Sequence, residues 1–233
     1  MKVAVIGAMN EEIERMQKEM SVEETITFAK VPFYVGKMCG IDIVLCKSGV
    51  GKVNAALTTQ ILIDRFEVSH ILFTGVAGAL DESLEVGDLV ISTSAMQHDL
   101  DASPLGFKRG EIPMYDGDSD FKASTRLVEI AKEAADSLTD RQVVCGRILS
   151  GDQFIANKEE VKQLKELFNG VCVEMEGASV AHVSDMNDVP FVIIRSMSDK
   201  ANGEAQISFQ EFTDIASEQS HLLVKAMLKE LKG

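Results

Sequence analysis

Cysteine, basic residues and long apolar runs are all in short supply in this sequence, and each shortage argues against a class of protein. Four of the 233 residues are cysteine, namely Cys39, Cys46, Cys145 and Cys172. They form no CxxC pair and have no histidine nearby at the spacing of a zinc site, which argues against a structural zinc ion. We therefore expect reduced thiols in a cytosolic protein.

The shortage of basic residues argues against nucleic acid and anionic membranes as partners. Lys and Arg number 23 against 37 Asp and Glu, which leaves a net charge of −14. Such a surface repels phosphate backbones and anionic lipid. No window approaches the roughly 18 apolar residues of a membrane span, and the N-terminus turns acidic after a short apolar stretch. We expect a cytoplasmic protein.

Short apolar runs alternate with helical patterns along the whole chain, without a low-complexity linker. Several runs lack clean alternation, which indicates strands buried on both faces, and the pattern favours one α/β domain over 1–233 with a mainly parallel or mixed sheet. Strands are expected at 2–8, 33–38, 42–47, 70–75, 87–92, 142–149, 170–175 and 190–196. Helices are expected to begin near Asn10, Gly51, Ser119, Asn157, Gly177 and Ser208.

Two glutamates interrupt the apolar run VCVEMEGASV at 171–180. The period-two pattern places Glu174 and Glu176 on one face of a strand, and Gly177 then ends the strand before a helix. Burying an unpaired carboxylate there would cost several kcal/mol, so Glu176 must be solvated, paired or engaged with a ligand. For Glu174 a structural salt bridge is expected.

Other polar or aromatic residues also follow expected strands. Glu12 follows the first strand, Phe154 the sixth, Glu176 the seventh and Asp199 the eighth. If these strands run parallel, all four side chains converge at one edge of the sheet. Three acids and an aromatic ring without an evident metal-ligand set suit a neutral, ring-bearing substrate and acid/base chemistry.

Six motifs follow one another along the chain. They are VIGAMNEE (5–12), SGVGKVNAA (48–56), TGVAGAL (74–80), SGDQFI (150–155), VEMEGASVAHV (173–183) and RSMSDKANGEAQISFQEF (195–212). Together they resemble the 5'-methylthioadenosine/S-adenosylhomocysteine nucleosidases of the nucleoside phosphorylase superfamily, and the resemblance runs from residue 1 to about residue 225.

This resemblance implies a three-layer α/β sandwich, with helices flanking a central mixed sheet, and a homodimer. It also implies irreversible hydrolysis of the adenine N-glycosidic bond of 5'-methylthioadenosine and S-adenosylhomocysteine, and of 5'-deoxyadenosine. The products would be adenine and the 5-substituted ribose. We expect no cofactor and no metal ion.

The chemistry of that bond gives each acid a role, again by resemblance. As the bond breaks, positive charge develops on the sugar and negative charge on the purine. Asp199 would protonate adenine N7, with the Ser198 hydroxyl orienting it, and Glu12 would activate water. Glu176 would accept hydrogen bonds from the ribose 2'- and 3'-hydroxyls, because a carboxylate has two acceptors for a vicinal diol.

The resemblance also implies the walls of the pocket. Phe154 would stack on adenine, and the Ile155 backbone would read the edge of the base. Met9, Met175 and Phe209 would line the sugar and the 5'-thio group, where soft sulfur suits a thioether. The further residues implied are Val76, Gly78 and Arg195 for substrate binding, and Ala102, Leu105 and Pro113 from the neighbouring subunit.

Each assignment has a structural alternative. Glu12 lies in the first turn of a helix, where an acid stabilises the helix terminus, and Glu176 or Asp199 could simply pair with Arg195. Phe154 and Phe209 could be core residues. The segment HDLDAS (98–103) suggests a metal site, but a turn or dimer contact is favoured without a third clustered ligand.

Two other functions stay open at this point. A purine nucleoside phosphorylase shares the fold, but it needs arginines for phosphate after the first strand, where this chain has Asn10, Glu11 and Glu12. A non-catalytic nucleoside-binding module is opposed by the three retained acids. Departures from the family pattern at Asn10, Val76 and Leu105 leave the preferred 5' substituent undetermined.

Overall fold

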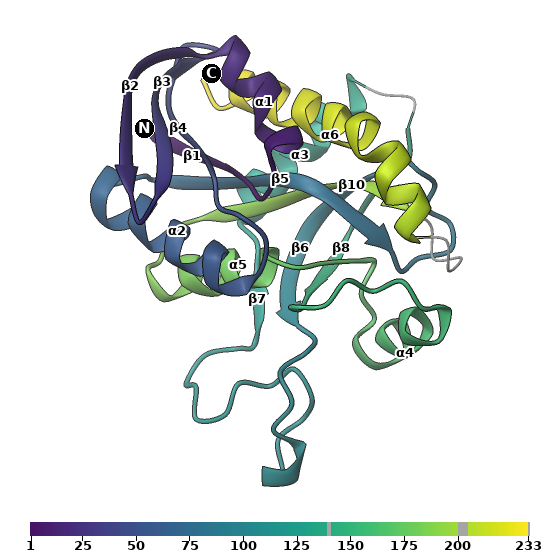
Figure 1. Cartoon of the computed structure of the whole chain (residues 1–233). Helices are drawn as coiled ribbons and strands as arrows, with labels where there is room; N and C mark the ends of the chain where they lie inside the picture. Colours follow the sequence, from purple (N-terminus) through teal and green to yellow (C-terminus); the bar gives the residue numbers. More distant parts are fainter. Residues whose placement is uncertain (139–140, 200–204, 233) are drawn as a thin grey trace.

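The computed structural model describes residues 1–138, 141–199 and 205–232, without the side chains of 205–211. Within this part of the chain, the strands form one mixed sheet, and the helices lie around it (Figure 1). The strands are β1 (Lys2–Gly7), β2 (Ser21–Phe28), β3 (Val31–Met38), β4 (Ile41–Lys47), β5 (His70–Ala79), β6 (Leu89–Gln97), β7 (Asp120–Lys122), β8 (Val143–Ser150), β9 (Cys172–Glu174) and β10 (Phe191–Asp199).

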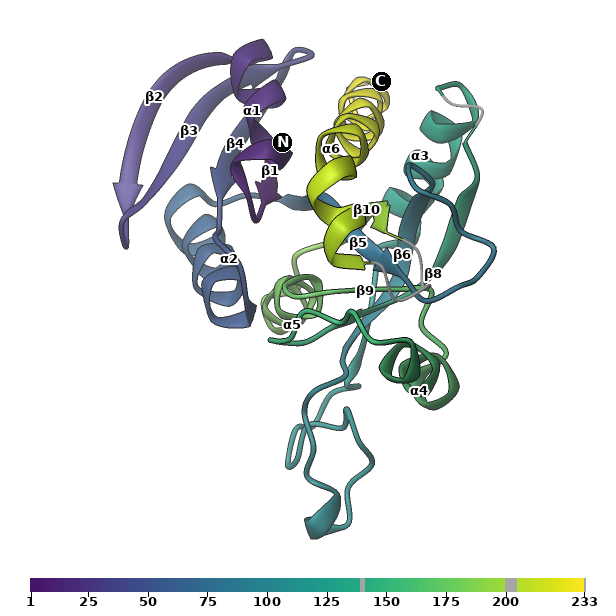
Figure 2. The same cartoon turned by 45° about the vertical axis from the view of Figure 1, so that its right-hand side comes forward.

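Helices cover both faces of the sheet, as Figures 1 and 2 show. α1, α3 and α6 pack on one face, and α2 and α5 pack on the other. α4 packs on a smaller cluster near the ends of β8 and β9. The helices are α1 (Asn10–Glu19), α2 (Lys52–Phe66), α3 (Thr125–Asp136), α4 (Lys158–Phe168), α5 (Gly177–Met186) and α6 (Ala205–Glu230), with a 3₁₀ turn η1 (Ser103–Leu105).

The central strands are apolar on both faces because each face has its own helical layer. In β1, Val3 and Val5 pack with α1, α3 and α6, whereas Ala4 and Ile6 pack with α2 and α5. All four side chains are fully buried. The missing alternation in the sequence is therefore the signature of a strand between two layers, and the expected three-layer α/β fold is confirmed.

β5 is the strand on which the sheet is organised. β1 and β10 pair with it in parallel, and β9 pairs with it antiparallel near its end. Because β10 also pairs with β6, and β8 pairs with both β6 and β9, the strands β5, β10, β6, β8 and β9 close into a ring. β4, β3 and β2 extend the sheet away from this ring.

The strands that precede Glu12, Phe154, Glu176 and Asp199 do not all run parallel, so the condition set in the sequence analysis is wrong. β8 and β9 run opposite to β1 and β10, because β9 is antiparallel to β5. The polar residues still meet, because β5 continues to Ala79 and pairs Gly78 with Val173 of β9.

Several expected elements also differ from the structure in their bounds, and two strands were not expected. The edge strand β2 has no fully buried residue, so it lacked a core-facing signal. The helix expected near Ser119 begins at Thr125, where the Ser124 hydroxyl accepts a hydrogen bond from the Leu127 N–H, and β7 occupies residues 120–122. The 70–75 strand continues to Ala79, through two glycines.

A long connection between β6 and β7 leaves the body of the molecule. This projecting segment, residues 98–119, carries η1 and extends away from both helical layers in Figures 1 and 2. The side chains of Leu105 and Met114 on it are 73% and 92% exposed. In the described part of the chain, each helix is too short or too polar to span a bilayer.

Candidate active site

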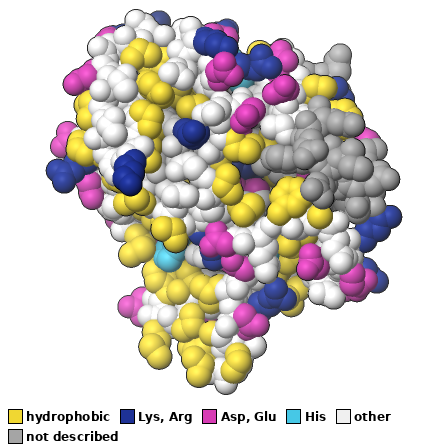
Figure 3. All heavy atoms as spheres, viewed as in Figure 1, with side chains coloured by type: hydrophobic (Ala, Val, Ile, Leu, Met, Phe, Trp, Pro, Cys, Tyr) yellow, Lys and Arg dark blue, Asp and Glu magenta, His cyan; other side chains and the backbone are white. Residues whose placement is uncertain are grey.

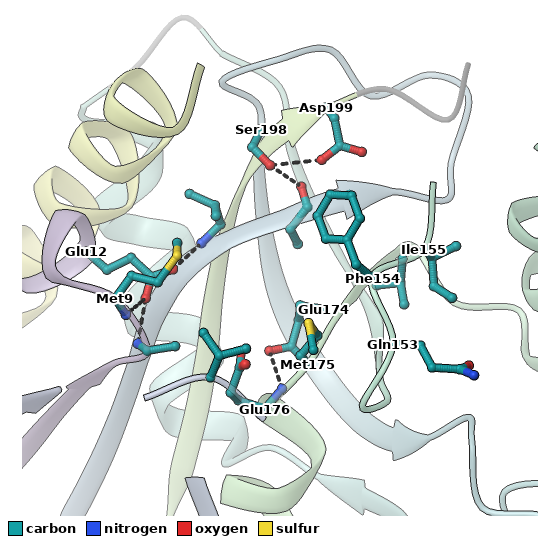
Figure 4. Close-up of a pocket in the computed structure, with 16 residues that line it drawn as sticks. Met9, Glu12, Gln153, Phe154, Ile155, Glu174, Met175, Glu176, Ser198 and Asp199 are labelled. Atoms are coloured by element: carbon teal, nitrogen blue, oxygen red, sulfur yellow. Dashed lines mark hydrogen bonds between the residues drawn. The ribbon is translucent and has the colours of Figure 1, made fainter. Parts of the chain in front are cut away.

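A cavity of about 260 Å³ lies where the ends of β1, β5, β9 and β10 meet (Figure 4). Its lining brings together residues from segments that are far apart in sequence. Ten of the residues expected at the site line it, namely Met9, Glu12, Val76, Gly78, Phe154, Ile155, Met175, Glu176, Ser198 and Asp199.

Glu12 is held rigidly at the start of α1. Its Oε2 accepts hydrogen bonds from the N–H groups of Ala8 (2.6 Å) and Met9 (2.9 Å), and its Oε1 accepts one from Val76 (3.0 Å). A Cβ atom at Gly75 would lie 2.4 Å from Oε1, so only glycine leaves space for this carboxylate. The hydrogen bond from the Met9 N–H also caps α1. Glu12 therefore stabilises the helix terminus, as the structural alternative expected, and it also lines the cavity.

The Glu12 carboxyl is an acid whose neutral form is favoured by its surroundings. It is only 5% exposed. Burial raises its pKa above the ordinary value of 4.5, and the Arg195 charge and the three backbone N–H groups oppose part of the rise. A raised pKa makes the Glu12 carboxylate a stronger proton acceptor within the cavity.

Glu174 and Glu176 share a face, as expected, but their hydrogen bonding differs. Glu174 accepts hydrogen bonds from Arg195 Nη2 (2.6 Å), the Gly177 N–H (2.9 Å) and the Ser150 hydroxyl. Glu176 accepts one from the Gly51 N–H (2.8 Å). Glu174 is therefore satisfied by protein groups, whereas Glu176 retains acceptor capacity toward the cavity.

Arg195 is placed differently from the expectation. Its side chain is 1% exposed and forms an ion pair with Glu174, so it lies behind the cavity wall rather than in it. The structural alternative in which Arg195 pairs with Glu176 is wrong, because Arg195 forms the salt bridge that was expected for Glu174. Arg195 Nε has no hydrogen-bond partner among the described residues.

Asp199 lies at the end of β10, on the side of the cavity opposite Glu12 (Figure 4). The Ser198 hydroxyl donates to Asp199 Oδ1 at 2.9 Å. Burial raises the pKa of Asp199 from 3.8 to about 6, although the Ser198 hydrogen bond lowers it. A Cβ at Gly78 would lie 2.9 Å from Oδ2, so a small residue is needed on β5 here as well.

The remaining cavity wall is largely apolar. Phe154 and Ile155 come from the loop after β8, and Phe154 is 50% exposed although it lines the cavity. Sequence reasoning missed Val50 and Gln153, which also line it. The sequence does contain a signal for Val50, because this residue stands between two glycines, Gly49 and Gly51, which indicate a tight turn. Both glycines adopt positive φ in the structure.

Several expected residues lie elsewhere. Ala102, Leu105 and Pro113 are on the projecting segment and do not line the cavity of their own chain. Phe209 lies outside the residues whose side chains are described. The Gly49–Gly51 turn binds Glu176 through the Gly51 N–H.

The HDLDAS segment is used for a structural contact. Asp99 forms an ion pair with Lys52 at 2.7 Å and accepts the Asp152 N–H at 2.9 Å, which joins the start of α2 to the Phe154 loop. Over the described ranges, no cluster of three His, Cys, Asp or Glu side chains is arranged to hold a metal ion.

Comparison with known proteins agrees with this geometry. The family model of the phosphorylase superfamily matches residues 2–229. A curated protein of Geobacillus sp. (strain WCH70), named 5'-methylthioadenosine/S-adenosylhomocysteine nucleosidase, is 40% identical over all 233 residues and all of its own length. The chain belongs to this nucleosidase family of the phosphorylase superfamily.

Solved structures of nucleosidases share the fold. The Neisseria meningitidis enzyme, in complex with methylthio-immucillin-A, has a TM-score of 0.94 at 39% identity, covering 98% of this chain and 99% of that one. The Colwellia psychrerythraea enzyme, in complex with adenine, has a TM-score of 0.94 at 38% identity, with coverages of 99% and 96%. The family resemblance of the motifs is thereby confirmed.

The raised pKa of Asp199 makes a prediction about stability in this nucleosidase. The folded state favours the protonated form of Asp199. The contribution of this group to the free energy of unfolding is therefore fully present below pH 3.8 and is lost as the pH rises through about 6. Asp199→Asn cannot ionise and should increase the free energy of unfolding by up to about 3 kcal/mol at pH 8, with about half of that gain at pH 5. Urea unfolding at both pH values measures it.

The exposed Asp136 of α3 supplies the control. Asp136→Asn should leave the free energy of unfolding within about 0.5 kcal/mol of the wild type at both pH values. Equal stability of Asp199→Asn and wild type at pH 8 would show that the folded state does not disfavour the Asp199 charge.

Proposed function

We propose that this chain hydrolyses the N-glycosidic bond of 5'-methylthioadenosine and S-adenosylhomocysteine, and of 5'-deoxyadenosine, to adenine and the 5-substituted ribose. The observation that carries the proposal is the cavity itself, in which buried Glu12 and Asp199 line opposite sides of a largely apolar space. The names of the Geobacillus relative and of the two solved nucleosidases support the first two of these substrates, 5'-methylthioadenosine and S-adenosylhomocysteine.

Asp199 is proposed to protonate the leaving adenine at N7. A carboxyl with a pKa of about 6 holds a useful protonated fraction near neutral pH, which an ordinary aspartic acid does not. Ser198 fixes one carboxyl oxygen, so the other oxygen is available to carry the proton. Phe154 lies next to Asp199 in Figure 4, where it would stack on the purine.

Glu12 is proposed to take the proton from the attacking water, and Glu176 to bind the ribose diol. The two carboxylates lie on the side of the cavity away from Asp199, with Met9 and Met175 labelled beside them in Figure 4. A nucleoside with its base against Phe154 would therefore place its sugar between the two glutamates. The methionine sulfurs would contact the 5'-thio group.

Water is favoured over phosphate as the nucleophile by the position of Glu12. The N–H groups of Ala8, Met9 and Val76 converge as an anion site would, but the Glu12 carboxylate already occupies all three. A phosphate ion there would lose these donors and would be repelled by the carboxylate. This observation disfavours the nucleoside phosphorylase alternative.

We also propose a homodimer, with one domain over residues 1–233 in the cytoplasm. Figure 3 shows hydrophobic side chains gathered on the projecting part of the molecule, where Leu105 is 73% exposed. Ala102, Leu105 and Pro113 would then reach the 5'-thio end of the partner's cavity. An exposed apolar projection of this kind is typical of an interface.

The dimer is tested by sedimentation equilibrium of the 25.4 kDa chain. The wild type should sediment at twice this mass, and Leu105→Asp should dissociate it, because a charge would be buried in the contact. Val22→Asp on the distant edge strand β2, where Val22 is 41% exposed, should remain dimeric. A monomeric wild type would contradict the proposal.

The proposed reaction is tested by adenine release from 5'-methylthioadenosine, with and without inorganic phosphate. Hydrolysis predicts the same rate in both conditions and free 5-methylthioribose as the sugar product. Recovery of a ribose 1-phosphate as the main product would establish phosphorolysis instead. Absence of adenine release in both conditions would favour the binding-module alternative.

The role of Glu12 is tested by Glu12→Gln. The amide keeps the size of the side chain but is a very poor base, so kcat should fall by at least the roughly 10²–10⁴-fold that general acid/base catalysis contributes. The KM should change little, because Glu176 and Phe154 hold the substrate.

Glu11 is the matched control, because it lies in the same first turn of α1 but is exposed. Glu11→Gln removes the same charge from the helix terminus and should keep wild-type kcat. If both variants keep it, Glu12 acts only on the helix terminus and not on water.

A further inference from the structure

Glu174 lines the cavity, yet its carboxylate already receives hydrogen bonds from four protein groups. Its carboxylate accepts from Arg195 Nη2, from the Ser150 hydroxyl, and from the N–H groups of Glu176 and Gly177. We propose that Glu174 is a positioning residue, which sets the place of the Glu176 carboxylate so that it can bind the ribose diol. This inference rests on the proposed function, because Glu176 must bind the sugar for its position to matter.

The start of α5 shows how Glu174 acts on Glu176. Glu176 is the N-cap residue of α5, and a residue in that position ordinarily uses its own side chain to accept the free N–H groups of the first turn. Here the Glu176 side chain makes no such bond.

Glu174 and Ser150 cap the helix instead. Glu174 accepts the N–H of Glu176 (3.2 Å) and of Gly177 (2.9 Å), and Ser150 Oγ accepts the N–H of Ala178 (2.7 Å). The Ser150 hydroxyl then donates to Glu174, so the two caps are joined. The Glu176 carboxylate is thereby released from the helix end and is free to face the cavity.

The geometry requires a charged, acceptor-only side chain at position 174. The Glu174 carboxylate receives four donors, and glutamine has one acceptor oxygen and would turn two N–H groups toward those donors. The negative charge also balances Arg195, which is buried at 1% exposure. A Cβ at Gly177 would lie 3.2 Å from Glu174 Oε1, so the following glycine allows the close approach.

Glu176 is held at its other end by the Gly51 N–H at 2.8 Å, in the turn before α2. The cap of α5 therefore fixes the backbone of Glu176, and Gly51 fixes one oxygen of its carboxylate. If the cap of α5 were lost, the hydrogen bond from Gly51 alone would not define the direction of the Glu176 side chain.

The test compares two substrates, 5'-methylthioadenosine and its analogue without the 2'- and 3'-hydroxyls. Glu174→Gln should lower kcat/KM on the intact ribose by about 10–100-fold, as small displacements of a binding group do. It should lower kcat/KM on the analogue by less than about 3-fold, because no diol is present for Glu176 to bind. A general loss of structure would affect both substrates equally.

A double-mutant cycle gives a second readout. If Glu174 acts through Glu176, adding Glu174→Gln to Glu176→Gln should change kcat/KM on the intact ribose by less than about 3-fold. Full additivity, together with equal losses on both substrates, would overturn the proposal and leave Glu174 with a purely structural role.

Two further variants keep the test decisive. Asp120→Asn breaks the ion pair of β7 with Arg147, away from the cavity, and should retain wild-type kcat/KM on both substrates even if the melting temperature falls. If Glu174→Gln does not fold, Ser150→Ala keeps the Arg195 ion pair and removes one cap. It should show a smaller loss, about 3–10-fold, again confined to the intact ribose.

Adenine release by the wild-type chain is measured first and tests the proposed function alone. A wild type that releases no adenine refutes that function. If the wild type releases adenine and Glu174→Gln lowers kcat/KM equally on both substrates, only the positioning role is refuted.

Discussion

The pairing of three strands with β5 is the constraint on which the site depends. β1, β10 and β9 deliver Glu12, Asp199 and Glu176, and each is hydrogen-bonded to β5, so the relative positions of the acids follow from the sheet register. Gly75 and Gly78 leave the room on β5 that two of the carboxylates need. A site built on paired strands holds its geometry more closely than one built on loops.

The charges buried around Arg195 are the second feature on which the site depends, and they lower the stability of the fold. Arg195 interacts with the charges of Glu174, Glu12 and Glu176, so one guanidinium must serve three carboxylates. It is further stabilised over the ring of Phe73, 4.0 Å from the ring centre. Burial raises the pKa values of both Glu12 and Glu176, and the negative charges of Glu174 and Glu12 raise that of Glu176 further. The chain thus keeps a destabilised group of acids that a more stable core would not contain.

The sequence predicted what depends on local pattern and on motif, and missed what depends on pairing across the fold. The uninterrupted apolar run of β1 indicated two covering layers, because both of its faces are buried. Strand direction was wrong for β8 and β9, because periodicity reports which face is buried and not which way a neighbour runs. Ten cavity residues were anticipated from motifs, whereas the partner of Arg195 was not, because two glutamates on one face look alike until their hydrogen bonds are known.

The closed ring of β5, β10, β6, β8 and β9 also bears on how this protein avoids self-association into fibres. The ring joins five strands to one another, and within the described chain β2 is the edge strand that ends the sheet on its other side. That edge carries the exposed acids Glu23 and Glu24 and a bulge between Val22 and Glu24. Charge and a bulge both prevent another strand from adding to an edge. The outermost strand of this mixed sheet is therefore protected against the addition of another chain by exposed acids, which belong to the acidic composition of the whole chain.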